Sequence, residues 1–161
     1  MTDLNSIDAL RTSKLGAELT PDQCRLLAER IKFRDLADGE VLLPEGTRDN
    51  HLYVIVNGAL RVVRGAGSPE EVSLFVLTTG DLVGELSFID GTEHYAGLVS
   101  RGTTRVFCLE REQLEELLKI DADAVYRVMR AILRTVHAIQ RRLSMQQVEL
   151  TNYIYKQHGK Y

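Results

Sequence analysis

The middle of the chain alternates between short apolar runs and polar turns, a pattern typical of β-strands. Ten of the 12 glycines lie between Leu36 and Val106, where turn signals recur roughly every eight to twelve residues. The predicted strands are Val41–Leu43, Leu52–Val56, Leu60–Val63, Val72–Leu77, Ala96–Val99 and Arg105–Leu109. Because no long helical pattern separates them, we expect an antiparallel β-roll over residues 33–109, of the double-stranded β-helix or jelly-roll-like type. Asp49–His51 is expected to be a solvated polar turn.

Helical patterns precede the strands. Thr20 followed by Pro21 offers an N-cap and a favourable first helical residue, and apolar residues continue this helix toward Phe33. A shorter helix is expected within Ser6–Leu15. We therefore expect helices to occupy residues 6–32, ahead of the roll.

Helical patterns also follow the strands. Glu112–Lys119 places leucines on one face, and Asp121 or Asp123 can cap a long helix that meets no Gly or Pro until Gly159. These helices are expected over residues 111–156. The whole chain, residues 1–161, is thus predicted to be one α+β domain, in which N-terminal helices and a long C-terminal helix flank the β-roll.

The long C-terminal helix carries a sustained apolar seam. Alternating steps of four and three from Val125 reach seven apolar residues and one glutamine: Met129, Ile132, Val136, Ile139, Leu143, Gln146, Leu150 and Tyr153. The seam is either the face that packs on the roll of the same chain or the core of a dimeric coiled coil. A helix from Asp121 to Asn152 would be about 45 Å long, more than one small domain covers, which favours the dimer.

The predicted dimer interface consists of six seam residues: Met129, Ile132, Val136, Ile139, Leu143 and Leu150. The two interpretations are compatible if the first turns pack on the roll and the distal part pairs with a second chain. Val128 and Leu133, which lie off the seam, are then expected to hold the first turns to the roll.

Composition narrows the class of protein. The 161 residues are 44% hydrophobic and 27% charged, which suits one globular domain, and the net charge of −3 argues against direct DNA binding. No apolar run approaches the roughly 20 residues of a membrane span, and the first ten residues do not resemble a signal peptide, so we expect a soluble, cytoplasmic protein. Cys24 and Cys108 are interpreted as reduced thiols without a chemical role.

Candidate chemistry is concentrated in the segment from Gly84 to Ala96. Gly84 lets the backbone approach a ligand closely, and the amides of Leu86 and Ser87 would open a short helix whose positive end attracts an anion. The Glu85 carboxylate would accept hydrogen bonds from hydroxyl groups, such as a ribose 2′-OH. Alternatively, Glu85 stabilises the helix start without any ligand.

Several motifs in chain order resemble those of the cyclic-nucleotide-binding domain family, which includes the catabolite activator protein and the regulatory subunits of protein kinase A. They are Asp38–Leu42, Glu45–Gly46, Leu52–Gly58 and Gly80–Ser87. The resemblance covers roughly Leu15 to Gln140. It implies an eight-stranded roll, a phosphate-binding cassette at Gly84–Ala96 and a long closing helix, with Glu85 on the ribose of the ligand.

The cassette departs from the family at one position. The family places an arginine on the cyclic phosphate nine or ten residues after the glutamate, whereas this chain has His94, followed by Tyr95 and Ala96. A histidine is mostly neutral at pH 7 and lacks the bidentate fork of arginine, so we expect phosphate binding to weaken by roughly 2–4 kcal/mol. Three arginines are candidates for compensation: Arg48, Arg101 and Arg105.

Other function classes are disfavoured. The chain has no HxH, HxxxH or GxSxG motif, so neither a metal site nor an enzyme is expected, and we do not expect a helix-turn-helix after the long helix. The expected ligand-binding residues are Gly84, Glu85, Leu86, Ser87, His94, Tyr95 and Ala96. We expect a regulatory sensor of cAMP or cGMP that needs no cofactor, forms a homodimer and signals to a separate effector protein. The alternative is a degenerate domain that binds no nucleotide and serves as an interaction scaffold.

Overall fold

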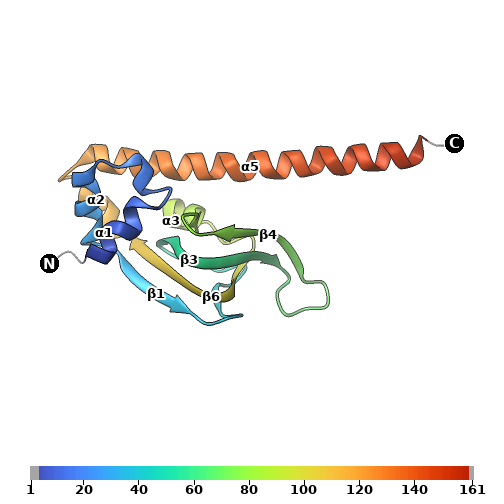
Figure 1. Cartoon of the computed structure of the whole chain (residues 1–161), viewed down its shortest axis with the longest axis horizontal. Coiled ribbons are helices and arrows are strands. Elements are labelled where there is room, and N and C mark those ends of the chain that lie inside the picture. Colours follow the sequence, from blue (N-terminus) through green and yellow to red (C-terminus); the bar gives the residue numbers. More distant parts are fainter. Residues whose placement is uncertain (1–3, 160–161) are drawn as a thin grey trace.

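The computed structural model describes residues 4–159 and shows the predicted α+β architecture (Figure 1). Three short helical elements come first: α1 (Leu4–Arg11), the 3₁₀ helix η1 (Gly16–Glu18) and α2 (Pro21–Ala28). Thr20 caps α2 as predicted, because its hydroxyl accepts from the Gln23 amide while the Gln23 side chain accepts from the Thr20 amide. The predicted extension of this helix toward Phe33 is wrong, since residues 32–36 pair with the last strand instead.

The six strands form one antiparallel sheet that curls into the roll. They are β1 (Lys32–Leu36), β2 (Val41–Leu43), β3 (His51–Arg64), β4 (Val72–Thr78), β5 (Leu82–Val83) and β6 (Gly97–Glu110). The order is β1-β6-β3-β4, with β2 also on β6 and β5 also on β3. The long strands β3 and β6 therefore form the centre of the roll.

Each long strand combines two predicted strands. Leu52–Val56 and Leu60–Val63 both belong to β3, and the glycine between them, Gly58, is not a turn. Its φ is 95°, and a Cβ there would lie 2.6 Å from the Thr103 carbonyl oxygen. The register between β3 and β6 shifts at this point. Gly58 thus marks a bulge that bends a continuous strand.

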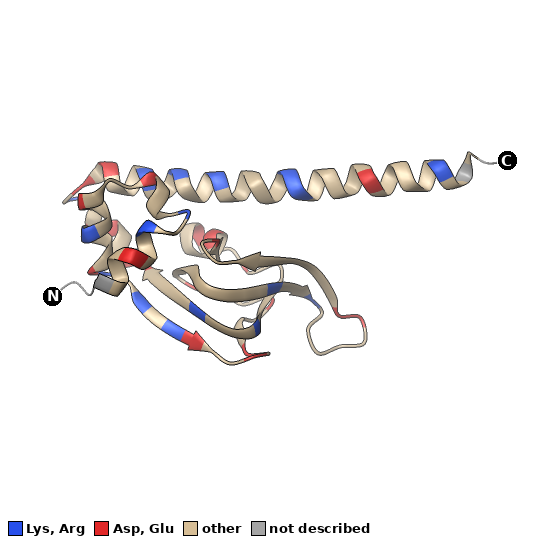
Figure 2. Ribbon diagram, in the orientation of Figure 1, with Lys and Arg blue, Asp and Glu red and all other residues tan. Residues whose placement is uncertain are grey.

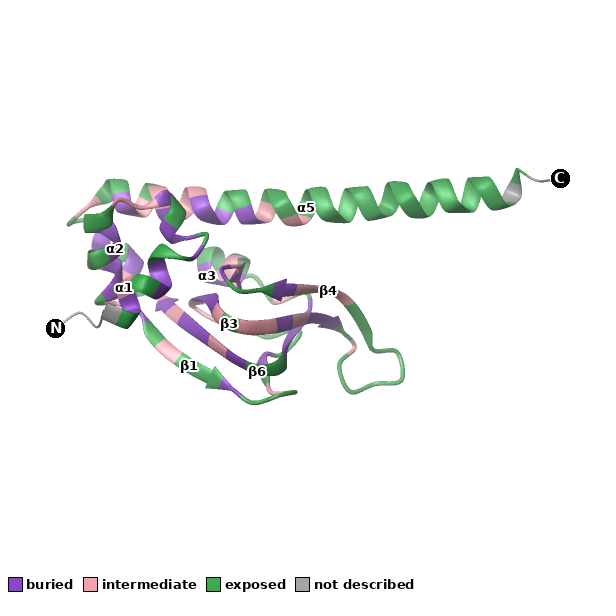
Figure 3. Cartoon of the chain, viewed as in Figure 1, coloured by how far each residue is buried: buried purple, intermediate pink, exposed green. Residues whose placement is uncertain are grey.

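The elements after the roll are α4 (Arg111–Leu117) and α5 (Ala122–His158), with α3 (Glu85–Asp90) inserted between β5 and β6. Asp121 caps α5 by accepting a hydrogen bond from the Ala124 amide. At 37 residues α5 is about 55 Å long. Figure 3 shows that its first half is partly buried, whereas its second half extends past the roll with its surface exposed.

The first half of α5 packs on its own chain. Val128 and Ile132 are fully buried in a core cluster with the N-terminal helices, and Met129 and Val136 pack against the same cluster. Val128 thus holds the helix to the roll as predicted. Leu133 does not, because it lies on the opposite face of α5 and is 61% exposed.

The same packing bears on the predicted dimer interface. Ile132 is 0% exposed, so it is buried by its own chain and has no surface left for a partner. Ile139 packs against a second core cluster, inside the roll. Of the six predicted interface residues, only Leu143 and Leu150 are well exposed. Within residues 4–159, no helix is long and apolar enough to span a membrane.

Candidate ligand-binding site

Gly84 brings the start of α3 close to the centre of the roll. Its φ of 78° is left-handed, and a Cβ there would lie 3.3 Å from both the His51 carbonyl oxygen and the Leu43 side chain. Glycine is therefore favoured by backbone angle and by space. The first hydrogen bond of α3 runs from the Phe88 amide to the Gly84 carbonyl, so the amides of residues 85–87 have no acceptor within the helix.

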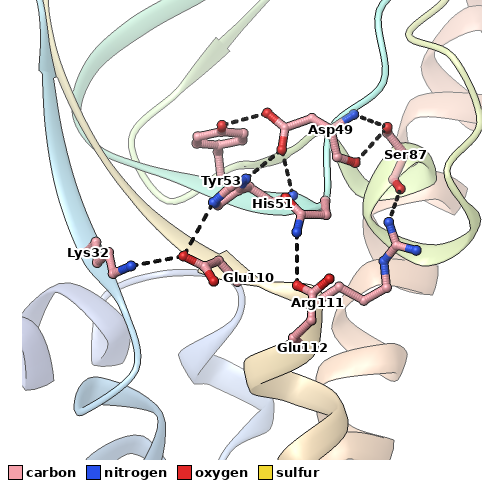
Figure 4. Close-up of polar contacts among 9 residues, drawn as sticks. Lys32, Asp49, His51, Tyr53, Ser87, Glu110, Arg111 and Glu112 are labelled. Atoms are coloured by element: carbon pink, nitrogen blue, oxygen red, sulfur yellow. Dashed lines mark hydrogen bonds and ion pairs between the residues drawn. The ribbon is translucent and has the colours of Figure 1, made fainter.

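Ser87 fastens α3 to the loop before β3 (Figure 4). Its hydroxyl accepts from the Asp49 amide at 2.7 Å and donates to the Asp49 carbonyl at 2.7 Å. The residue is 0% exposed. The Ser87 side chain thus has a structural role, and only its backbone amide remains as a possible ligand contact.

Glu85 is the ionisable group at the start of α3. Burial raises the pKa of its carboxyl, and the opposing effect is a hydrogen bond from its own amide. Within the part of the chain that the structure describes, no lysine or arginine pairs with it. A half-buried carboxylate without a cation is unfavourable for folding, which points to a role in binding.

The segment that carries His94 is held by the loop at residues 46–47. The His94 amide donates to the Thr47 carbonyl at 2.9 Å, and the Gly46 amide donates to the His94 carbonyl at 2.8 Å. The Nε2 atom of His94 is buried without a hydrogen-bond partner among the described residues. Burial lowers the pKa of this histidine, so the ring is neutral at pH 7.

A narrow pocket lies between the cassette, the roll and α5. Of the seven predicted ligand-binding residues, all but Ser87 line this pocket. The six that do are Gly84, Glu85, Leu86, His94, Tyr95 and Ala96. The opposite wall is mostly apolar and includes Phe75 and Leu77 from β4 and Ile139 from α5. The cavity volume is about 50 Å³. This is far below the roughly 300 Å³ or more of a typical ligand pocket. Ile139 thus narrows the space that a nucleotide would need.

The three candidate arginines do not supply the missing phosphate contact. Arg48 pairs with Glu93 at 3.2 Å, at the edge of the cassette. Arg105 lies over the Phe33 ring at 4.6 Å, and Arg101 is exposed on β6. None of the three lines the pocket.

Sequence analysis missed Arg64, the last residue of β3. Burial and the nearby Glu85 raise the pKa of the Tyr95 phenol, and the positive charge of Arg64 partly opposes them. Arg64 therefore lies near the cassette, although its guanidinium pairs with Glu45 at 3.0 Å. No motif indicates this, because 31 positions separate Arg64 from Tyr95 and only the curl of the roll brings them together.

A polar network joins the cassette to the start of α4 (Figure 4). The Asp49 carboxylate accepts from the Tyr53 hydroxyl at 2.8 Å, contacts His51 Nδ1 at 2.6 Å and has a lowered pKa, because these bonds outweigh the effect of burial. His51 Nε2 lies 3.7 Å from Glu110, which also pairs with Lys32. The expectation of a solvated His51 is wrong, since its side chain is only 29% exposed.

Two other kinds of site are disfavoured. In residues 4–159 no group of three or more His, Cys, Asp or Glu side chains is arranged to hold a metal ion. Cys24 is buried and Cys108 is half-buried, and burial raises the pKa of both thiols. Such thiols are poor nucleophiles.

Comparison with known proteins identifies the family. Residues 33–121 match the family model of the cyclic nucleotide-binding domain. The chain therefore belongs to this family, whose fold its β-roll and cassette share.

Curated relatives are larger proteins. The chain is 24% identical over 133 residues to human cGMP-dependent protein kinase 2, covering 83% of this chain and 17% of the kinase. It is 27% identical over 110 residues to the cyclic AMP receptor protein of Thermus thermophilus, covering 68% of this chain and 51% of the receptor. The chain thus spans between about a sixth and a half of these relatives.

Solved structures confirm the fold. A cyclic nucleotide-binding domain from Methylobacillus flagellatus superposes with a TM-score of 0.75 at 23% identity, covering 86% of this chain and 78% of that one. The regulatory subunit of a cAMP-independent protein kinase A from Trypanosoma brucei has a TM-score of 0.70 at 22% identity, covering 83% and 45%. A triple mutant of that subunit, in which a threonine becomes arginine and the next residue, a valine, becomes alanine, is bound to cAMP.

Proposed function

We propose that this chain is a regulatory sensor module that binds a cyclic nucleotide between α3 and α5 and transmits occupancy through α5. The observation that carries the proposal is Glu85, a half-buried carboxyl with a raised pKa that lines the pocket and has no cation partner in the described part of the chain. A group in this setting gains most from a ligand that donates hydroxyl hydrogens, as a ribose does.

Each part of the site has a distinct task in this proposal. The Glu85 carboxylate accepts hydrogen bonds from the ribose, and the free amides of Leu86 and Ser87 face the phosphate. His94 Nε2, which has no hydrogen-bond partner among residues 4–159, contacts the phosphate with a single hydrogen bond. Because the family's arginine makes two charged bonds, we expect weak binding.

Ligand binding would displace α5. The present cavity holds about 50 Å³, and Ile139 forms part of its wall. A nucleotide therefore fits only if Ile139, and with it α5, moves away from the roll. The site then has two states, one with α5 packed on the roll and one with α5 moved away. The ligand binds only the second state, so its binding shifts the equilibrium toward it and changes the position of α5. No catalytic step is needed, and the signal would pass to a second copy or to a separate effector protein.

The alternative is an interaction scaffold that binds no cyclic nucleotide. His94 in place of arginine and the narrow cavity favour it. The Trypanosoma brucei comparison points the same way, since the mutant bound to cAMP gained an arginine followed by alanine, together with a glutamate-to-alanine substitution. The sensor and the scaffold differ in one property, affinity for the nucleotide.

Isothermal titration with cAMP and cGMP up to millimolar concentration distinguishes the two. We expect weak binding by the natural sequence, tighter at about pH 6 than at about pH 8 because a phosphate favours protonated His94. His94→Arg is expected to tighten binding at least about tenfold, in line with a gain of one charged bidentate contact. His137→Arg, on exposed α5, is the matched control and should change nothing.

The outcomes are decisive. If neither the natural sequence nor His94→Arg binds at millimolar ligand, the sensor proposal is wrong and the scaffold remains. Equal tightening by His94→Arg and His137→Arg would contradict the pocket assignment, because a charge on the outer face of α5 is remote from the cassette. A flat pH profile would exclude a protonated His94 from the phosphate contact.

A further inference from the structure

A second cavity lies under α5, on the side of the N-terminal helices. Its volume is about 450 Å³, which falls within the range of small-molecule pockets. It is bounded by η1, by the turn between β4 and β5, and by α5. Leu77 and Ile139 line this cavity and the cassette pocket alike, so they form the wall between the two.

Small side chains on α5 leave this cavity unfilled. The helix faces it with Ala131, Thr135 and Ala138 over two turns, and Ala17 lies across from them on η1. Leu77 and Ile139 complete an apolar floor. The cavity opens to solvent at Ala138 and Arg142, so a ligand with an apolar body would gain by displacing water from the apolar lining.

The charges around the cavity leave one cation without a carboxylate. Lys14 pairs with Asp81. Glu18, whose side chain is only 6% exposed, accepts a hydrogen bond from Arg130 at 2.7 Å and forms an ion pair with Arg134 at 2.6 Å. Figure 2 shows further basic residues along α5.

Arg142 is the remaining cation at the rim. Its guanidinium carbon lies 5.8 Å from the centroid of the Phe75 ring, and no Asp or Glu within residues 4–159 pairs with it. Among the charged side chains that line the cavity, Lys14 is balanced by Asp81 and Arg134 by Glu18, so Arg142 is the lining cation left without a carboxylate, above an apolar floor. Arg130, which shares Glu18, does not line the cavity. This combination selects the chemistry of the occupant.

We propose that this cavity binds a small organic monoanion with an apolar body. The body lies on Ala131, Ala138 and Ile139, and the acidic group pairs with Arg142. The inference rests on this cavity alone and holds whether or not the cassette binds a cyclic nucleotide. If both sites are filled, their shared wall at Leu77 and Ile139 couples them.

The test uses the full chain and the fluorescence of 1-anilinonaphthalene-8-sulfonate, an aromatic monoanion that brightens when it leaves water. Ala138→Trp fills the cavity from its rim, and Ser144→Trp on exposed distal α5 is its matched control. Arg142→Gln removes the cation, and Arg141→Gln removes a neighbouring charge on the outer face. We expect saturable binding that Ala138→Trp abolishes and that Arg142→Gln weakens about tenfold, while both controls bind as the natural sequence does.

Three results would overturn the proposal. The first is no saturable fluorescence change with the natural sequence. The second is an equal effect of a variant and its matched control. If Ala138→Trp and Ser144→Trp act alike, the dye binds the exposed distal helix, and if Arg142→Gln and Arg141→Gln act alike, the dye responds to net charge. The third is a change of oligomeric state with Ala138→Trp in the absence of dye binding, which would make a second copy the occupant. Because cyclic nucleotides are absent, these results are independent of the cassette titration.

Discussion

Glu85 shows how a single residue can serve binding at the expense of folding. Its carboxyl is half-buried beside apolar residues, and burial raises its pKa. A raised carboxyl pKa means that the folded state holds the proton more tightly than the unfolded chain does. The stabilising effect of this protonation is complete below the unfolded pKa of about 4.3 and is lost as pH rises through the folded pKa.

Glu85→Gln is therefore expected to raise the free energy of unfolding at neutral pH and to weaken ligand binding. The gain should nearly vanish at about pH 4, where the natural carboxyl is mostly protonated in both states. Urea denaturation at about pH 4 and pH 8 measures it. Glu93→Gln, an exposed partner of Arg48, is the control. If Glu85→Gln is no more stable than Glu93→Gln at neutral pH, Glu85 is not unfavourably buried.

Ser87 has the opposite character, because its side chain serves the fold. Ser87→Ala leaves the amide and the carbonyl of Asp49 without their partner at a site that is 0% exposed. We expect a loss of about 1–3 kcal/mol in the free energy of unfolding. Ser73→Ala, on the exposed face of β4, should change stability by less than about 0.5 kcal/mol. Equal effects in urea denaturation would show that the Asp49 contacts are unimportant.

At the scale of elements, local chemistry explains what the sequence predicts well. The start of α2 follows from Thr20 and Gln23, and the start of α5 follows from Asp121, because each cap contacts residues within one turn. The end of α2 is not predictable in this way. Residues 32–36 prefer a strand only because β6, more than 60 positions later, is there to pair with them. The sequence around Gly58 likewise predicts a turn, because the bulge that Gly58 forms depends on its close approach to Thr103, a residue distant in the chain.

The candidate site shows the same difference between contacts that are local in the sequence and contacts that are distant in it. The grouping of Gly84, Glu85 and His94 in one pocket was predictable, because these residues lie close together in the chain. The role of the Ser87 hydroxyl was not, since Asp49 is 38 residues away. The narrowing of the pocket by Ile139 was also beyond sequence analysis, because a seam residue gives no sign of which surface it covers.

The seam of α5 serves two purposes in succession. Ile132 and Ile139 use it to pack on the roll, and Leu143 and Leu150 continue it beyond the roll at 43% and 60% exposure. An apolar stripe that continues an established packing face is suited to a second copy of the helix. The dimer interface that we propose is therefore confined to the distal half of α5.

Leu143→Asp combined with Leu150→Asp is expected to convert a dimer to a monomer, because two charges would enter the apolar seam. Sedimentation velocity at micromolar concentration measures the change. Met145→Asp combined with Val148→Asp places the same charges on the other side of the helix and should leave the dimer intact. A natural sequence that sediments as a monomer, or equal dissociation by both double variants, would refute this interface.

At the scale of the whole molecule, Glu18 of η1 adds a polar contact to the apolar packing that holds α5 to the N-terminal helices. The Glu18 carboxylate accepts a hydrogen bond from Arg130 and forms an ion pair with Arg134, and the Glu18 carbonyl accepts from Arg127 at 3.1 Å. Three arginines on successive turns of α5 thus contact one residue of η1. The first half of α5 and the N-terminal helices should therefore move as one body.

Glu18→Gln is expected to loosen this contact and to lower the free energy of unfolding by about 1–3 kcal/mol, as loss of hydrogen bonds to a charged group does. Hydrogen exchange should speed up in residues 124–139 and remain unchanged in residues 143–157, which the contact does not reach. Glu149→Gln, on exposed distal α5, is the control. Uniform faster exchange along α5 would contradict a local contact.

Because the second half of α5 projects past the roll, a small tilt of its first half produces a larger displacement at its far end. From Ile139 to the last turn the helix extends about 28 Å, and beyond the contact of Arg142 with the Phe75 ring its described residues are exposed, so a tilt of about 10° at Ile139 would move its tip by roughly 5 Å. A tilt that shifts α5 only slightly at the pocket would therefore move the far end of the helix by nearly the pitch of one helical turn. A partner that binds the tip could therefore respond to the ligand without approaching the site that holds it.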